Sequence, residues 1–103
     1  MADLTQAEWS NQLANDADAV IIDVRTEAEI AEGYIPSMKH MDIFNPSGFM
    51  EAAKQMVPSK NYYVYCRSGA RSAQACAILN TLGFKNTFNL MGGFIEWRGE
   101  KTI

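Results

Sequence analysis

The sequence has too few of the residues that build metal centres and disulfide frameworks. Its 103 residues include one histidine and two cysteines, and none of these has the paired spacing of a zinc site. No uninterrupted apolar run approaches the length needed to cross a bilayer. The net charge is −3, whereas a nucleic-acid-binding domain usually carries a basic face. We therefore expect no metal, no cofactor, no membrane insertion and no nucleic-acid partner.

The residues that are present are typical of a small folded domain. Hydrophobic residues make up 48% and charged residues 20% of the chain, which is enough apolar surface for one modest core and too much for a disordered chain. We expect residues 1–103 to form a single domain. The first nine residues lack the basic and apolar segments of a signal peptide, so we expect a cytoplasmic protein whose thiols stay reduced.

Helix and strand patterns alternate along the chain. Residues 5–8 and 26–29 match the capping box Thr-x-x-Glu, which begins a helix, and short apolar runs are typical of strands buried on both faces. The alternation predicts an α/β fold with a mainly parallel sheet and helices on both faces, whose ligand site lies beyond the carboxyl ends of the strands. The expected helices run from Thr5 to about residue 15, from Thr26 to Gly33, and over residues 49–56, 71–82 and 94–98, and the expected strands cover residues 19–24, 40–44, 62–65 and 86–90.

The segment with the clearest chemical signal is residues 66–72, which joins a predicted buried strand to a helix. The six residues after Cys66 include no proline, so six backbone N–H groups are available. Gly69 permits the left-handed turn that gathers such groups into an anion-binding nest. The helix dipole and Arg71 add positive potential at the same place. The candidate active-loop and substrate-binding residues are Arg67, Ser68, Gly69, Ala70, Arg71 and Ser72.

A cysteine that faces this nest should ionise near neutral pH. A free thiol with a pKa of about 8.5 is only about 5–10% thiolate near neutral pH, and a downward shift of about 2 units, worth about 2.7 kcal/mol, makes it mostly thiolate. The alternative for Cys66 is a cysteine that only packs in the core. His40 lies on another predicted strand, so no Cys–His pair is evident. For Cys76 we favour a packing role over that of a resolving thiol, because most of the chain between the two cysteines is helical and holds them too far apart for a disulfide.

Four segments, in the same order along the chain, resemble the rhodanese family. Residues 66–72 match the family's active-loop pattern Cys-x-x-Gly-x-Arg-Ser, and residues 23–25 match its Asp-x-Arg at a strand end. Residues 33–36 stand where the family has Gly-His-Ile-Pro, with Tyr34 in place of the histidine, and residues 90–97 match its closing Leu-x-Gly-Gly-x-x-x-Trp. The resemblance covers nearly the whole chain.

The resemblance implies a five-stranded parallel sheet, with a short first strand near residues 2–4, and sulfurtransferase activity. It makes Cys66 the nucleophile that takes a sulfane sulfur from an anionic donor such as thiosulfate, holds it as a persulfide and passes it to a thiol or cyanide. The N–H groups of the loop hold the terminal sulfur of the persulfide, and Arg67 and Arg71 attract the donor. A protein could also serve as the sulfur donor or acceptor.

Three alternatives stay open at the level of sequence. Asp23 and Arg25 could support the active loop or form only a strand-end ion pair, which contributes little if exposed. The protein could be a persulfide carrier or interaction module with poor turnover of small donors. It could also be a cysteine phosphatase or arsenate reductase of the same general fold. The phosphatase loop has five residues between cysteine and arginine, whereas four separate Cys66 from Arg71, and the shorter loop fits a sulfur atom better than a phosphate.

Overall fold

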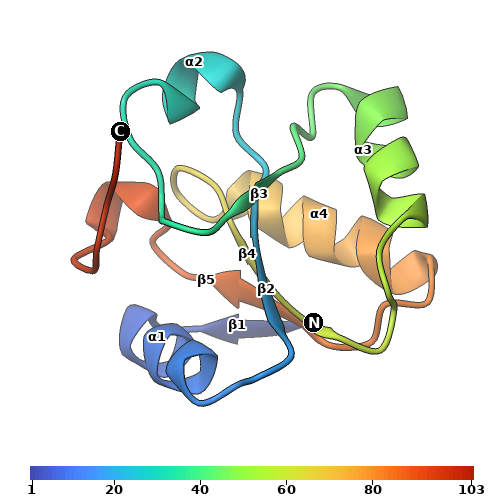
Figure 1. Cartoon of the computed structure of the whole chain (residues 1–103), viewed down its shortest axis with the longest axis horizontal. Coiled ribbons are helices and arrows are strands. Elements are labelled where there is room, and N and C mark those ends of the chain that lie inside the picture. Colours follow the sequence, from blue (N-terminus) through green and yellow to red (C-terminus); the bar gives the residue numbers. More distant parts are fainter.

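A five-stranded parallel sheet forms the centre of the protein, and Figure 1 shows helices packed on either side of it. The computed structural model describes residues 1–103. In chain order the elements are β1 (Ala2–Leu4), α1 (Gln6–Ala14), β2 (Ala19–Asp23), α2 (Glu27–Ile30), β3 (Lys39–His40), α3 (Pro46–Lys54), β4 (Asn61–Tyr65), α4 (Ala70–Thr81), β5 (Thr87–Leu90) and the 3₁₀ helix η1 (Phe94–Glu96). The strand order is β1-β5-β4-β2-β3, and all neighbours are parallel. The predicted α/β fold is confirmed.

The central strand β4 separates two hydrophobic clusters, because successive side chains point to opposite faces of a strand. Tyr62, Val64 and the adjacent Cys66 belong to the cluster that also contains residues of α3 and α4. Tyr63 and Tyr65 belong to the other cluster, with residues of α1 and the C-terminal segment. The alternation therefore directs the Cys66 side chain toward the face that α4 covers.

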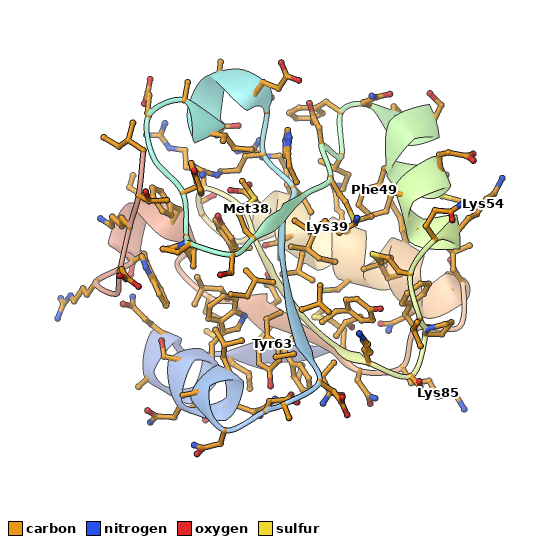
Figure 2. The ribbon with its side chains drawn as sticks, in the orientation of Figure 1. Met38, Lys39, Phe49, Lys54, Tyr63 and Lys85 are labelled. Carbon is orange, nitrogen blue, oxygen red and sulfur yellow. The ribbon has the colours of Figure 1, made fainter.

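Each face of the sheet is covered by helices that bring large apolar side chains to it. Phe49 of α3 packs on one face, and Trp9 of α1 packs edge-on against Tyr63 on the other. Figure 2 shows Phe49 and Tyr63 inside the molecule on opposite sides of the sheet, whereas Lys54 and Lys85 lie at its periphery. Burial on both faces explains why the strands have continuous apolar runs rather than alternating ones.

The strand expected over residues 40–44 is wrong in its extent. β3 covers only Lys39–His40, although the backbone N–H groups of Met41 and Ile43 still donate to the carbonyl oxygens of Asp23 and Val24. The Oδ1 atom of Asp42 accepts a hydrogen bond from the backbone N–H of Phe44 at 2.8 Å. This local bond between side chain and backbone takes up the N–H of Phe44, so the strand does not reach residue 44.

The helix expected from Thr26 to Gly33 is the shorter α2, which ends at Ile30. Two further helices also differ from their predicted extents. The helix expected over residues 49–56 is α3, which begins at Pro46, because Asn45 caps it and proline suits the first helical position. The helix expected over residues 94–98 is the three-residue η1, which ends where Trp97 adopts an extended backbone. Both differences lie at helix ends, where local hydrogen bonds decide the boundary.

The two predicted capping boxes are confirmed at the starts of α1 and α2. In each, the threonine side chain accepts a hydrogen bond from the backbone N–H of the glutamate, whose carboxylate accepts one from the threonine N–H. The longest helix, α4, has 12 residues, and none of the helices combines the length and apolar character of a membrane span. The second capping box places Glu29 of α2 beside the loop described next.

Candidate active site

Residues 66–72 lie at the carboxyl end of β4, with β2 and β5 as the neighbouring strands. Cys66 follows β4 directly, and α4 begins at Ala70; Figure 1 shows the loop between these two elements. Gly69 precedes α4 with a φ of 112°, in the left-handed region that glycine adopts without a steric penalty. The fold therefore places a cysteine and a helix N-terminus together at the sheet edge where ligands bind in this class of fold.

The sulfur of Cys66 faces hydrogen-bond donors from its own loop. The backbone N–H of Gly69 donates to Sγ at 3.1 Å, and the hydroxyl of Ser72 lies 3.3 Å from it. Burial opposes ionisation, but hydrogen bonds from the hydroxyl and N–H of Ser72 and from the N–H groups of Gly69 and Ser68 outweigh it, so the pKa of Cys66 lies below its ordinary value. The donors around the sulfur agree with the direction of shift expected from the sequence.

An ion pair with Glu29 of α2 holds Arg71. Nη1 of the arginine donates to Oε1 of the carboxylate at 2.7 Å, and Nη2 donates to Oε2 at 2.8 Å. The hydrogen bonds from Arg71 are the main reason why the pKa of Glu29 is lowered to about 2. The expectation that Arg71 attracts an anionic donor stays a prediction, and Glu29 balances the charge that this attraction would use. Its contacts tie the start of α4 to α2.

Arg67 is the exposed cation of the loop. Its side chain forms no ion pair and no hydrogen bond with other residues. It borders a hollow of about 220 Å³ whose other lining residues are Arg25, Glu29, Glu32, Phe94 and Ile95. Of the two loop arginines, Arg67 alone is free to meet a ligand from solvent.

Asp23 and Arg25 form a buried ion pair beside the loop. Nη2 of Arg25 donates to Oδ2 of Asp23 and to the carbonyl oxygen of Gly33, both at 2.8 Å. The guanidinium also lies 4.3 Å from the ring centroid of Phe94, whose backbone N–H donates to the carbonyl oxygen of Cys66 at 2.9 Å. The pair is therefore not an exposed strand-end contact. It joins the end of β2, the segment after α2 and η1 into a support behind the loop.

Two residues of this site were not assigned from the sequence. A Cβ atom on Gly93 would lie 2.6 Å from the backbone nitrogen of Ser68, so only glycine allows the turn after β5 to pack against the loop. Asn89 of β5 contacts the hydroxyl of Ser72 through its Oδ1 atom. A buried asparagine in an otherwise apolar strand is the sequence signal that could have pointed to it, because buried polar groups need partners.

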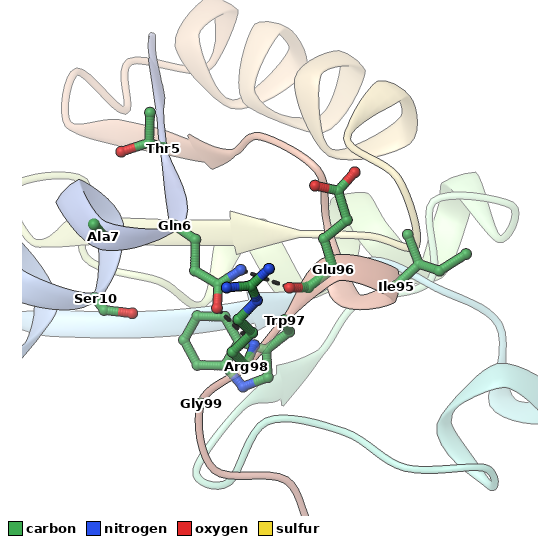
Figure 3. Close-up of a pocket in the computed structure, with 9 residues that line it drawn as sticks. All are labelled: Thr5, Gln6, Ala7, Ser10, Ile95, Glu96, Trp97, Arg98 and Gly99. Carbon is green, nitrogen blue, oxygen red and sulfur yellow. Dashed lines mark hydrogen bonds between the residues drawn. The ribbon is translucent and has the colours of Figure 1, made fainter.

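The largest surface cleft lies away from the cysteine. It has a volume of about 820 Å³ and separates the first turn of α1 from residues 95–99, as Figure 3 shows. Gln6 spans it, donating to the carbonyl oxygen of Glu96 at 2.7 Å and accepting from the backbone N–H of Arg98 at 2.6 Å. No cysteine or histidine lines this cleft, and no group of three metal-ligating side chains occurs in the structure. The candidate nucleophile Cys66 lies instead in the loop of residues 66–72.

Comparisons with known proteins identify the family. The family model of the rhodanese-like domain matches residues 6–100. The chain belongs to the rhodanese family. It is 40% identical to a sulfurtransferase of Allochromatium vinosum over 89 residues, which cover 85% of this chain and 79% of that protein. It is 34% identical to the thiosulfate sulfurtransferase GlpE of Pseudomonas fluorescens, with 84% of this chain and 77% of that protein covered. A rhodanese-like domain protein of Staphylococcus aureus has a crystal structure that matches with a TM-score of 0.82 and 31% identity, covering 97% of this chain and 94% of that one.

This rhodanese departs from the usual family pattern at Tyr34, which stands in place of a histidine. The backbone of Tyr34 forms two hydrogen bonds of 2.9 Å with that of Thr102, so the position serves to anchor the C-terminal segment. The carboxylate of Asp23 is satisfied by the side chain and backbone N–H of Arg25. The departure therefore leaves no buried side-chain nitrogen or oxygen without a hydrogen-bond partner, and the rhodanese pattern from Cys66 onward is intact.

Proposed function

We propose that this rhodanese transfers a sulfane sulfur through a persulfide on Cys66, with thiosulfate as a small-molecule donor. The Cys66 thiolate attacks the outer sulfur of thiosulfate, the S–S bond of the donor breaks, and sulfite leaves with the bonding electron pair. The thiolate of an acceptor, or cyanide, then attacks the outer sulfur of the persulfide. The S–S bond to Cys66 breaks and the thiolate is restored, so the cycle needs no outside oxidant or reductant.

The observation that carries this proposal is the contact of Cys66 Sγ with the N–H of Gly69 at 3.1 Å and the hydroxyl of Ser72 at 3.3 Å. Donors placed in this way stabilise an anionic sulfur, which is required both for the attacking thiolate and for the terminal sulfur of the persulfide. The N-terminus of the 12-residue α4 adds positive potential at the same place. The residues that we propose to surround the transferred sulfur are Arg67, Ser68, Gly69, Ala70, Arg71 and Ser72.

Arg67 is the residue that we propose to attract an anionic donor. Arg71 and Arg25 also lie near the loop, but Glu29 balances the first and Asp23 the second. One unpaired cation supplies a local attraction that salt screens. We therefore expect thiosulfate to bind only weakly, through Arg67 and the N–H groups of the loop.

A protein that carries a persulfide is the second donor that a specific observation favours. Two exposed apolar side chains stand beside the loop: Phe44 is 67% exposed and Ile95 is 60% exposed. The Phe44 ring centroid lies 5.4 Å from the Arg71 guanidinium, and Ile95 shares the hollow that Arg67 borders. Exposed apolar residues at the edge of a site are typical of protein contacts. Steady-state turnover with thiosulfate, compared with transfer from a persulfidated protein, distinguishes the two donors.

The contacts of Arg71 also argue against the phosphatase and arsenate reductase alternatives. An oxyanion of that size is best held by a guanidinium whose two-pronged face is free. In this protein both prongs of Arg71 are taken by the carboxylate of Glu29. A single sulfur atom needs only the hydrogen-bond donors of the loop, so the geometry supports sulfur transfer. The cytoplasmic location expected from the sequence stays a prediction.

Intact-mass spectrometry after incubation with thiosulfate tests the proposed function. We expect the protein to gain the mass of one sulfur atom, and cyanide or a thiol to remove it. Cys66→Ser should gain nothing, whereas the matched control Cys76→Ser should gain one sulfur as the unmodified protein does. A sulfur gain on Cys66→Ser, or none on the unmodified protein from thiosulfate or from a persulfidated protein, would contradict the proposal.

A further inference from the structure

The hydroxyl of Ser72 has one proton and three acceptors within reach. Its Oγ lies 3.3 Å from Cys66 Sγ, 3.2 Å from the carbonyl oxygen of Gly69 and 2.5 Å from Oδ1 of Asn89. A hydroxyl donates its proton to one acceptor at a time. Ser72 therefore cannot donate to the sulfur and to Asn89 together, although both contacts have hydrogen-bond length.

The orientation of the Asn89 amide is set by two acceptors that contact its nitrogen, one of which, the carbonyl oxygen of Gly69, also lies within reach of Ser72. Its Nδ2 donates to Oδ1 of Asp3 in β1 at 2.9 Å and to the carbonyl oxygen of Gly69 at 3.2 Å. Because both partners are acceptors, Nδ2 faces them and Oδ1 faces Ser72. Asn89 is only 4% exposed, and Ser72 is the one donor that contacts its Oδ1. A buried carbonyl oxygen that loses its donor is unfavourable.

We propose that Asn89 is a positioning residue that acts through Ser72, by competing with the Cys66 thiolate for the hydroxyl proton. When Cys66 is a thiol, its S–H donates to Ser72 Oγ while Ser72 donates to Asn89. When Cys66 loses its proton to solvent, the Ser72 hydroxyl turns toward the anionic sulfur, and Oδ1 of Asn89 is left without a donor. Asn89 therefore favours the thiol and opposes the ionisation that the rest of the loop promotes.

A residue that limits the ionisation of Cys66 is useful because the sulfur must attack the donor as well as ionise. An attacking thiolate becomes intrinsically less nucleophilic as its pKa falls, so the best attacking thiol has a pKa near the ambient pH. A loop that stabilised the thiolate without restraint would make a poorer nucleophile. The inference rests on the proposed role of Cys66 as nucleophile for its functional meaning, but its test measures only ionisation. A failure to form a persulfide would therefore leave that test unaffected.

The charged groups that face this part of the loop from other elements are already paired. The groups are Arg71 of α4 with Glu29 of α2, Arg25 with Asp23 at the end of β2, and Asp3 of β1 with the amide of Asn89. Substitution of Asn89 removes the partner of only Asp3, which is exposed to solvent. The control for a change at Asp3 is the single variant Asp3→Asn, which removes its charge and keeps Asn89 in place.

Asn89→Leu removes the competing acceptor at nearly constant side-chain size. We expect the midpoint of the Cys66 thiolate titration, followed by ultraviolet absorbance, to fall by about half to one pH unit, a roughly three- to tenfold rise in the ratio of thiolate to thiol. The exchange Asp3→Asn with Asn89→Asp keeps the bond between β1 and β5 but places an anionic acceptor beside Ser72. It should raise the midpoint above that of Asp3→Asn alone.

The same substitutions in a Ser72→Ala background decide whether Asn89 acts through Ser72. In that background Asn89→Leu should leave the midpoint unchanged, because the shared proton is gone. An equal fall in both backgrounds, or no fall in the protein that retains Ser72, would overturn the proposal. If Asn89→Leu does not fold, as judged by circular dichroism, the exchange variant carries the test, and the absence of a rise overturns it.

Discussion

Cys66 and Cys76 are both free, buried thiols, yet their surroundings shift ionisation in opposite directions. Cys76 lies within α4 and is fully buried; burial raises its pKa to about 11, and a hydrogen bond with Thr87 offsets little of this rise. Cys66 is 1% exposed, and burial acts on it in the same direction. The donors of Gly69 and Ser72 reverse the result. Burial alone therefore does not distinguish a reactive cysteine from a packed one, whereas the hydrogen-bond donors that face the sulfur do.

The largest effect expected from this comparison is the loss of sulfur transfer in Cys66→Ser. Serine is nearly isosteric with cysteine but cannot form a persulfide, so the variant should fold and show no thiosulfate:cyanide activity. Cys76→Ser, the matched control within α4, should keep most of the activity and lose some stability, because it places a hydroxyl in the core. Residual turnover in Cys66→Ser, or complete loss in Cys76→Ser with the fold intact, would break the distinction between the two thiols.

Ser72→Ala should raise the pKa of Cys66 toward that of Cys76, because it removes a hydrogen-bond donor from the sulfur. The hydroxyl is the largest favourable contribution to the thiolate, and a hydrogen bond to a charged group is typically worth about 1.5–3 kcal/mol, or roughly 1–2 pKa units. We expect the pKa of Cys66 to rise by about one unit and turnover at neutral pH to fall about tenfold, with partial recovery as the pH is raised. A pH–rate profile measures this. Loss of activity without a shift in the profile would mean that Ser72 only supports the structure.

Glu29→Gln tests whether charge or hydrogen-bond donation separates the two cysteines. Because the donors dominate, the Cys66 midpoint should move less than in Ser72→Ala, while stability at neutral pH should fall by about 1 kcal/mol through weakening of the partly exposed pair with Arg71. The pKa of Glu29 is lowered from 4.5 to about 2, so the unfolded chain binds the proton more readily. The contribution of the pair is therefore complete above about pH 4.5 and is lost as the pH falls toward 2.

Urea denaturation of Glu29→Gln and the unmodified protein at several pH values measures that loss. The difference in unfolding free energy should shrink as the pH falls from about 4.5 to about 2. Glu27→Gln is the matched control, because Glu27 is exposed on the same helix and forms no ion pair. A constant difference at all pH values, or an equal effect of Glu27→Gln, would show that the ion pair does not stabilise the start of α4.

The smallest expected effect is that of Arg67→Ala. An exposed cation that attracts the donor contributes equally to ground-state and transition-state binding, so KM for thiosulfate should rise about threefold with kcat nearly unchanged. Added salt should raise KM for thiosulfate more in the unmodified protein than in the variant. Arg98→Ala, which removes another exposed arginine at the cleft away from Cys66, should change neither constant. A fall in kcat for Arg67→Ala would assign Arg67 a role in the reaction itself.

Much of the fold and the donors that surround Cys66 could be predicted because their signals are local. The capping boxes, the turn at Gly69 and each buried strand can be identified from residues that are close together in the sequence. The loop from Cys66 to Ser72 folds upon itself, so seven consecutive residues were enough to predict the direction of the thiol pKa shift. The prediction of a strand as far as residue 44 was wrong, because the side chain of Asp42 makes a local bond with the N–H of Phe44 that the apolar pattern did not reveal.

The contacts that were missed join residues far apart in the sequence. Glu29 already had a complete role in the second capping box, so nothing in the sequence called for Arg71 as a second partner. Gly93 was noted only as part of the closing pattern of residues 90–97, although its contact with Ser68 leaves no room for a side chain. Asn89 meets Ser72 only because β5 and α4 pack together. Such pairings depend on the tertiary fold, and a local pattern, such as an asparagine in a buried strand, shows at most that a partner is needed and not which residue it is.

Thiolate titration of Cys66 tests the central claim most directly. The ultraviolet absorbance of the unmodified protein is measured against pH, and the same curve for Cys66→Ser is subtracted. The account predicts a difference curve with a midpoint clearly below that of a free cysteine, about 8.5. The curve of Cys66→Ser itself should show no thiolate signal near that pH, because the pKa of Cys76 is raised to about 11. A midpoint at or above about 8.5 would contradict the claim that the loop donors outweigh burial and make Cys66 the reactive thiol.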